Sequence, residues 1–140
     1  MSMALSCDSK VENLLLGRFV GTYQVEESWR QTDDIFDRET TDTGSHSYEL
    51  TIEIFDDDYD DLVLNNLHKS RDYGSLDEND AELILIRPTG NSDDGRWGTG
   101  GGTIRLDGDL IYLDYRSFIY HEGSNGFSSR WITGTGVRIK

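Results

Sequence analysis

Apolar and polar residues alternate along most of the chain, and the first such run begins at Phe19. Up to Trp29 its large apolar side chains fall on one side, which only Glu27 interrupts. A period of two is that of a strand with one buried face. Gly21 lies inside the run and predicts a bend or a close backbone approach. The pattern therefore predicts a long, curved strand over residues 19–29.

Further alternating or apolar runs predict more strands. Tyr48, Leu50 and Ile52 share one face of a predicted strand from His46 to Phe55. Asp107-Gly108 is a strong turn signal, so residues 103–118 predict a hairpin. The remaining strands are predicted at 62–67, 81–87 and 128–140, with connections at 31–44, 56–61, 68–80, 88–102 and 119–127. Roughly seven strands joined by turns predict an antiparallel all-β barrel or sandwich.

The chain before the first strand has a different pattern. Residues 1–9 have no period and predict a disordered head. Lys10 to Leu16 predicts one or two helical turns with Val11, Leu14 and Leu15 on one face. With no repeat and no linker, residues 10–140 are expected to form a single domain preceded by a short helical plug.

Composition supports the strand prediction and excludes some partners. The chain has 140 residues, with 15 Gly, 1 Pro and 11% aromatic residues, which suits strands joined by glycine turns. Its 27 acidic and 13 basic residues give a net charge of −14. Such a surface repels phosphate backbones and anionic headgroups. Nucleic-acid binding, and membrane binding through basic residues, are therefore not expected.

Both ends of the domain resemble those of known barrels. The Gly21-Thr22-Tyr23 opening after a helical plug, the Gly-Thr-Gly sequence at 134–136 and the late Arg138 resemble lipocalin and calycin barrels, and more closely the lipocalin-like domains of small bacterial surface lipoproteins. The resemblance implies an up-and-down barrel whose bottom is closed by Tyr23, with Arg138 packed across it. A guanidinium can lie on a ring face and donate to carbonyls at a strand end. The alternative is an ordinary core tyrosine and an ordinary edge arginine.

Cys7 is the single cysteine of the chain. The sequence Ala-Leu-Ser-Cys resembles the end of a bacterial lipoprotein signal, which implies acylation of Cys7 and an extracytoplasmic location, at the outer membrane or cell surface. The membrane would then be reached only through this lipid anchor. The alternative is a stray thiol in a disordered head.

Other chemistry-bearing residues predict no catalytic or metal site. The acidic run 56–61 lacks the spacing of a calcium-binding loop; a solvated turn explains it, with structural calcium as the alternative. His46, His68 and His121 are too scattered in sequence for a metal motif. The glycine run at 98–103 lacks the Lys-Ser/Thr of a phosphate loop. We therefore expect no metal, no cofactor and no enzymatic activity.

Two functions compete. The first is a monomeric, lipid-anchored binding module whose barrel mouth holds a small apolar or amphipathic ligand. Its lining is predicted from inward aromatics, namely Tyr48, Tyr112, Tyr115 and Trp131, with space left by Gly134 and Gly136. The second is a filled barrel that presents its loops to a protein or glycan, with Trp29, Trp97 and Tyr120 exposed. Alternation shows which face is inside, but not whether the inside is full.

Overall fold

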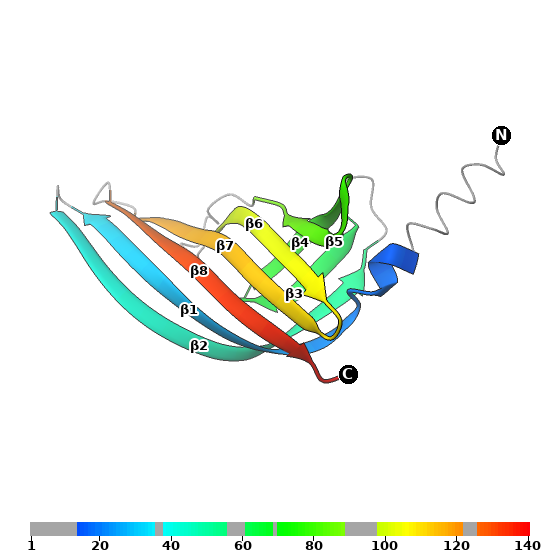
Figure 1. The fold of residues 1–140 in the computed structure, drawn as a ribbon. Helices are drawn as coiled ribbons and strands as arrows, with labels where there is room; N and C mark the ends of the chain where they lie inside the picture. The colour runs from blue at the N-terminus through cyan, green and yellow to red at the C-terminus, as the bar shows by residue number, and fades with distance from the viewer. Residues whose placement is uncertain (1–13, 36–37, 56–60, 69, 89–97, 122–125) are drawn as a thin grey trace.

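The computed structural model describes residues 14–35, 38–55, 61–68, 70–88, 98–121 and 126–140. Eight antiparallel strands form one closed barrel, in which each strand pairs with the next and β8 pairs with β1 (Figure 1). The strands are β1 (Gly21–Ile35), β2 (Arg38–Ile54), β3 (Leu62–Leu67), β4 (Ser70–Asp77), β5 (Asp80–Ile86), β6 (Gly98–Asp107), β7 (Leu110–His121) and β8 (Gly126–Arg138). The prediction of an antiparallel all-β fold is confirmed.

Several predicted sites lie outside the described residues. These are the head 1–9 with Cys7, the helix start at 10–13, most of the acidic run (56–60) and Trp97, together with the side chains of Tyr120 and His121. Within the described part of the chain, no helix is long and apolar enough to cross a membrane.

The barrel has one long and one short wall. Strands β1, β2, β7 and β8, the long wall, have 12 to 17 residues each, whereas β3, β4 and β5, the short wall, have six to eight. Only Thr51–Ile54 of β2 pair with β3, so the rest of β2 rises beyond the short wall. In Figure 1 the tips of the long hairpins lie at the left, far from the helical turn. We call this end of the barrel the mouth.

Several predicted connections are partly or mostly strand, including both ends of the predicted connection 119–127, where β7 runs to His121 and β8 starts at Gly126. Residues 31–44, predicted as a loop, are mostly strand, because β1 runs to Ile35 and β2 starts at Arg38. This polar stretch pairs along its whole length, from Gln31↔Asp42 to Ile35↔Arg38. β4 lies inside the predicted connection 68–80, and β6 begins inside the predicted glycine loop 88–102. Partner strands supply backbone hydrogen bonds to these segments, which therefore need no apolar alternation of their own.

The end opposite the mouth is packed with apolar side chains. Helical residues 14–17 lead into it, and Leu16 and Phe19 join the core. Leu14, predicted to face the core, is 75% exposed; the buried pair is instead Leu16 and Phe19, three residues apart. The other members of the core are Tyr23, Val25, Tyr48, Leu50, Ile52, Leu62, Leu64, Leu67, Ile84, Ile86, Ile104, Leu106, Ile111, Leu113, Tyr115 and Ile132.

Tyr23 and Arg138 meet at this apolar end, directly opposite each other on β1 and β8. The guanidinium carbon of Arg138 lies 5.2 Å from the Tyr23 ring centroid, and Arg138 Nη2 donates to the Tyr23 hydroxyl over 2.7 Å. The hydroxyl itself donates to the carbonyl of Phe19 over 2.8 Å. Arg138 also donates to the carbonyl of Arg18. Through these hydrogen bonds, the last strand is held to the first strand and to the residues that follow the helical plug.

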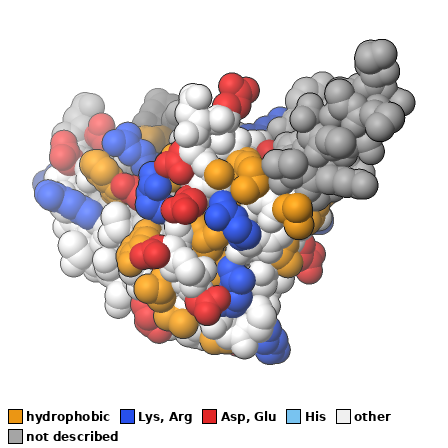
Figure 2. Space-filling model, turned by 45° about the vertical axis from the view of Figure 1, so that its right-hand side comes forward, with side chains coloured by type: hydrophobic (Ala, Val, Ile, Leu, Met, Phe, Trp, Pro, Cys, Tyr) orange, Lys and Arg blue, Asp and Glu red, His pale blue; other side chains and the backbone are white. Residues whose placement is uncertain are grey.

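The outer surface has no field of a single sign on the face that Figure 2 shows. Acidic and basic side chains alternate there with small groups of hydrophobic ones. Despite the net charge of −14, arginines are therefore present among the acidic groups.

We expect Arg138→Ala to destabilise the protein by about 1–3 kcal/mol, because it removes the packed stem and a charge-assisted hydrogen bond. The control is Arg71→Ala, which removes an exposed arginine lying over Tyr73 at 5.7 Å. Urea denaturation measures both variants. Equal, near-zero losses would show that Arg138 does not hold the barrel end together.

Candidate functional site

Glu27 is the acidic residue that interrupts the apolar face of β1, and it points into the barrel. Its side chain is 0% exposed. Gly134 lies opposite Glu27 on β8. A Cβ added at Gly134 would lie 2.8 Å from Glu27 Cβ, so the glycine leaves room for the Glu27 side chain. Gly136 likewise faces Ile111 and Val25. The prediction that these two glycines leave open space is wrong, because neighbouring side chains occupy it.

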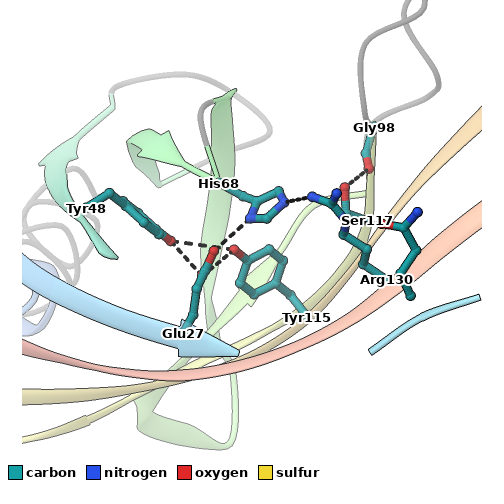
Figure 3. A network of polar contacts seen from close by, with 8 residues as sticks. Glu27, Tyr48, His68, Gly98, Tyr115, Ser117 and Arg130 are labelled. Atoms are coloured by element: carbon teal, nitrogen blue, oxygen red, sulfur yellow. Dashed lines mark hydrogen bonds and ion pairs between the residues drawn. The ribbon is translucent and has the colours of Figure 1, made fainter. Parts of the chain in front are cut away.

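Three side chains donate to the Glu27 carboxylate (Figure 3). Tyr48 and Tyr115 donate their hydroxyls to Oε2 over 2.9 and 2.7 Å. His68 Nδ1 lies 2.7 Å from Oε1. Burying a carboxylate is unfavourable unless hydrogen bonds replace its water. Glu27 meets that condition with donors from β2, β7 and the β3–β4 turn.

The β3–β4 turn aims His68 inward. Asn66 and His68 both adopt left-handed backbone conformations, with φ of 74° and 48°, which tighten the turn. Asn66 Nδ2 donates to the carbonyl of Glu49 on β2 over 2.9 Å, which anchors the tip of the short wall against the long one. The imidazole of His68 consequently lies over the interior, beside Glu27.

His68 connects Glu27 to Arg130 of β8. Arg130 Nη1 lies 2.8 Å from His68 Nε2, and a guanidinium can only donate. Nε2 therefore accepts, and Nδ1 carries the proton that it donates to Glu27. Both ring nitrogens are engaged, so His68 has no free nitrogen for proton transfer. The arrangement fixes the orientation of the imidazole between Glu27 and Arg130.

Arg130 is held within the mouth by several groups of β1. Its Nε donates to Gln31 Oε1 over 2.6 Å, and its guanidinium carbon lies 4.7 Å from the Trp29 ring centroid. Burial lowers the pKa of Arg130, and the charges of Asp33 and Glu27 oppose that shift. Arg130 thus remains a cation between two carboxylates.

His46 stands beside this network on β2. Its ring stacks on Tyr48 with centroids 5.1 Å apart and lies edge-on to His68 at 6.1 Å. His46 Nε2 is buried, and no residue in the described ranges gives it a hydrogen-bond partner. A buried polar nitrogen without a partner is unfavourable. His46 Nε2 thus keeps an unused hydrogen-bonding capacity within the described part of the mouth.

Polar groups continue around the barrel beyond this network. Asp72 on β4 accepts a hydrogen bond from Thr99 on β6 over 2.8 Å, and both residues are buried. Ser117 on β7 donates to the carbonyl of Gly98 over 2.9 Å, and Ser128 on β8 donates to Asp33. The interior is therefore divided into an apolar half and a polar half toward the mouth.

The structure brings together only part of the predicted ligand lining. Tyr48 and Tyr115 are buried and face the interior, whereas Trp131 and Tyr112 are 54% and 43% exposed. Their predicted inward orientation is wrong, because the aliphatic neighbours Ile132 and Ile111 take the inner positions of β8 and β7. Tyr23 and Arg138 contact each other at the opposite end.

Sequence reasoning missed Glu27, Arg130 and the role of two histidines. Glu27 did carry a signal, since it stands in phase with apolar residues, and a charge at such a position needs buried partners. His68 and Arg130 carried none, because a turn and a distant strand bring them to Glu27. Within the described ranges, no group of three or more His, Cys, Asp and Glu side chains is arranged to hold a metal ion.

Comparison with known proteins gave no match: neither a protein-family model nor a curated protein nor a solved structure matches the chain.

We expect Glu27→Gln to destabilise the protein by about 1–3 kcal/mol, because the amide leaves at least one of three buried donors without an acceptor. Tyr48→Phe tests the same network by removing one donor. Since both variants affect the same hydrogen bond, their effects in the double variant should be less than additive. Urea denaturation of the two single variants and the double variant measures this; strict additivity would contradict a shared network.

Alkaline pH should destabilise the fold through Tyr48 and Tyr115. Burial is the largest cause, and it raises the pKa of both phenols. The charge of Glu27 raises the pKa of Tyr48 further. The charges of Tyr48 and Glu27 raise the pKa of Tyr115 further. Unfolded tyrosine releases its proton near pH 10 or so, while the folded phenols keep theirs. Stability is therefore full below about pH 10 and falls as the pH rises further.

Urea denaturation between about pH 8 and 12 measures this slope. The variant Tyr48→Phe removes one of the shifted phenols and should flatten the slope, even though it lowers stability at neutral pH. An unchanged slope in this variant would contradict the assignment.

Proposed function

We propose that the protein is a lipocalin-like binding module that holds a small amphipathic ligand at the mouth of its barrel. The observation that carries the proposal is the buried, unpartnered Nε2 of His46, set among aromatic rings in the polar half of the interior. The lipocalin-like assignment is supported by the Tyr23–Arg138 contact beside the helical plug.

The amphipathic nature of the ligand follows from the division of the interior. The apolar half is occupied by its own side chains, many of them fully buried, so a purely apolar ligand has no place there. Around the mouth, Trp29, His46 and His68 offer ring surfaces, and polar atoms lie beside them. A ligand with a planar part and a hydrogen-bonding group fits both features.

The polar network also supports binding over a purely structural role. An apolar core of similar volume is commonly as stable as a buried ion pair, or more stable. Perturbed, buried ionisable groups concentrate at functional sites. The Glu27–His68–Arg130 chain fixes the ring orientations around His46 in advance, which lowers the entropy lost on binding.

The proposal includes an extracytoplasmic location with a lipid on Cys7, for which the sequence around Cys7 is the support. Mass spectrometry of the protein extracted from native membranes would detect the acyl group. An unmodified Cys7 in a cytosolic fraction would remove the anchor from the proposal and leave the mouth site unaffected.

The test of binding is titration with the uncharged fluorescent probe N-phenyl-1-naphthylamine. We expect saturable binding that His46→Ala and Trp29→Ala each weaken about tenfold, the effect of losing roughly 1.4 kcal/mol. The matched control is Tyr112→Ala, which removes an exposed aromatic side chain outside the barrel and should change nothing. Absence of saturable binding, or equal effects of all three variants, would favour the filled barrel that serves as an interaction protein.

A further inference from the structure

An exposed tryptophan stands between two arginines on the outer face of the long wall. Trp131 of β8 lies opposite Arg30 of β1 and opposite Arg116 of β7. All three side chains are exposed. The Arg116 guanidinium carbon lies 4.8 Å from the indole centroid. Asp114 accepts the indole N–H over 2.8 Å, which restrains the ring.

Two surface grooves flank this tryptophan. The first has a volume of about 680 Å³ and runs between Trp131 and β2, and the second has about 610 Å³ and runs toward Phe118 and Phe127. Trp131 and Arg30 line both grooves. The two grooves thus adjoin along the tryptophan, and one elongated ligand can occupy both. We call the grooves, with Trp131, Arg30 and Arg116, the outer platform.

The charge of the outer platform is opposite to that of the protein. Among the described residues, no carboxylate lines either groove, although the chain carries 27 acidic residues against 13 basic ones. Arg30 and Arg116 are the charged side chains on its outward face. The Asp114 carboxylate beside them accepts the indole N–H of Trp131. Two adjacent guanidiniums favour an anionic ligand, and they bind carboxylates in paired hydrogen bonds.

The remaining lining chemistry favours a sugar over a protein. The aromatic lining, namely Trp29, Trp131, Phe118 and Phe127, suits a sugar ring and a protein interface alike. The hydroxyl groups that line the first groove, those of Ser28, Thr43, Ser45 and Thr133, are what favours the sugar. Hydroxyls exchange hydrogen bonds with sugar hydroxyls, and an indole packs against the C–H face of a pyranose ring.

We propose that the outer platform binds a carboxylate-bearing oligosaccharide, with one sugar ring against Trp131 and a uronate carboxylate on Arg30 or Arg116. The centre of this site differs from that of the mouth, because Trp131, Arg30 and Arg116 are exposed on the outer face, whereas Glu27 and Tyr48 are buried in the interior. The two sites adjoin at Trp29 and Arg130, each of which also lines one of the grooves.

Isothermal titration calorimetry with a short oligogalacturonate tests the proposal, and its fully methyl-esterified form serves as the uncharged counterpart. We expect saturable binding of the acid form that weakens as salt is added. Methyl esterification should weaken binding about tenfold, since it removes the charge-assisted hydrogen bonds. Equal binding of acid and ester, or no saturable binding of the acid, would overturn the proposal.

Variants locate the binding on the surface. Trp131→Ala, Arg30→Gln and Arg116→Gln should each weaken binding about tenfold. The matched control is Arg71→Gln, because Arg71 also lies exposed over an aromatic ring, that of Tyr73 on β4. Equal losses in this control would indicate non-specific attraction to arginine and would overturn the site.

Two further measurements separate the outer platform from its alternatives. His46→Ala should leave glycan binding unchanged, so failure of the mouth site and failure of the outer platform are distinguishable. Polyglutamate serves as an acidic protein segment with similar charge and no sugar ring. If polyglutamate binds more tightly than the oligogalacturonate and depends on the same three residues, the partner is a protein and the glycan assignment is wrong.

Discussion

The burial of one carboxylate, that of Glu27, determines how the barrel interior is built. A carboxylate cannot be removed from water without strong donors, and Glu27 has three of them. They come from β2, from the β3–β4 turn and from β7. Because these elements are far apart in the chain, satisfying Glu27 holds strands on different sides of the barrel at fixed distances from one another.

The same requirement divides the interior. Below Glu27 the residues are apolar and packed around Phe19 and Tyr23. Toward the mouth, Glu27 needs polar partners, and these need partners in turn: His68 is followed by Arg130, and Arg130 by Gln31. A polar chain of this kind stabilises only when nearly every member is satisfied. His46 Nε2 lacks a hydrogen-bond partner among the described residues, so its hydrogen-bonding capacity is unused.

Because the two walls differ in length, the long wall carries one set of residues on its inner face and another on its outer face. Because the short wall ends near the level of Glu49, where Asn66 caps the β2 carbonyl, the inner face of the long wall carries the mouth residues. The outer face of the same strands carries the outer platform around Trp131. Strand alternation assigns consecutive residues to opposite faces, so Arg130 donates to His68 and Gln31, whereas Trp131 lies exposed under Arg116.

The sequence by itself determined the strand character, the Asp107-Gly108 turn and the inward positions of Tyr23, Val25, Tyr48 and Leu50, because a period of two is a local property. It did not determine the polar strands at 31–44 or β4, whose stability comes from pairing with neighbours. Only the tertiary structure decided that Trp131 faces outward and that His68 and Arg130 reach Glu27. The contacts of this network join residues as far as 99 positions apart, as between Arg130 and Gln31. Their partners are set by barrel closure and register, which local alternation does not encode.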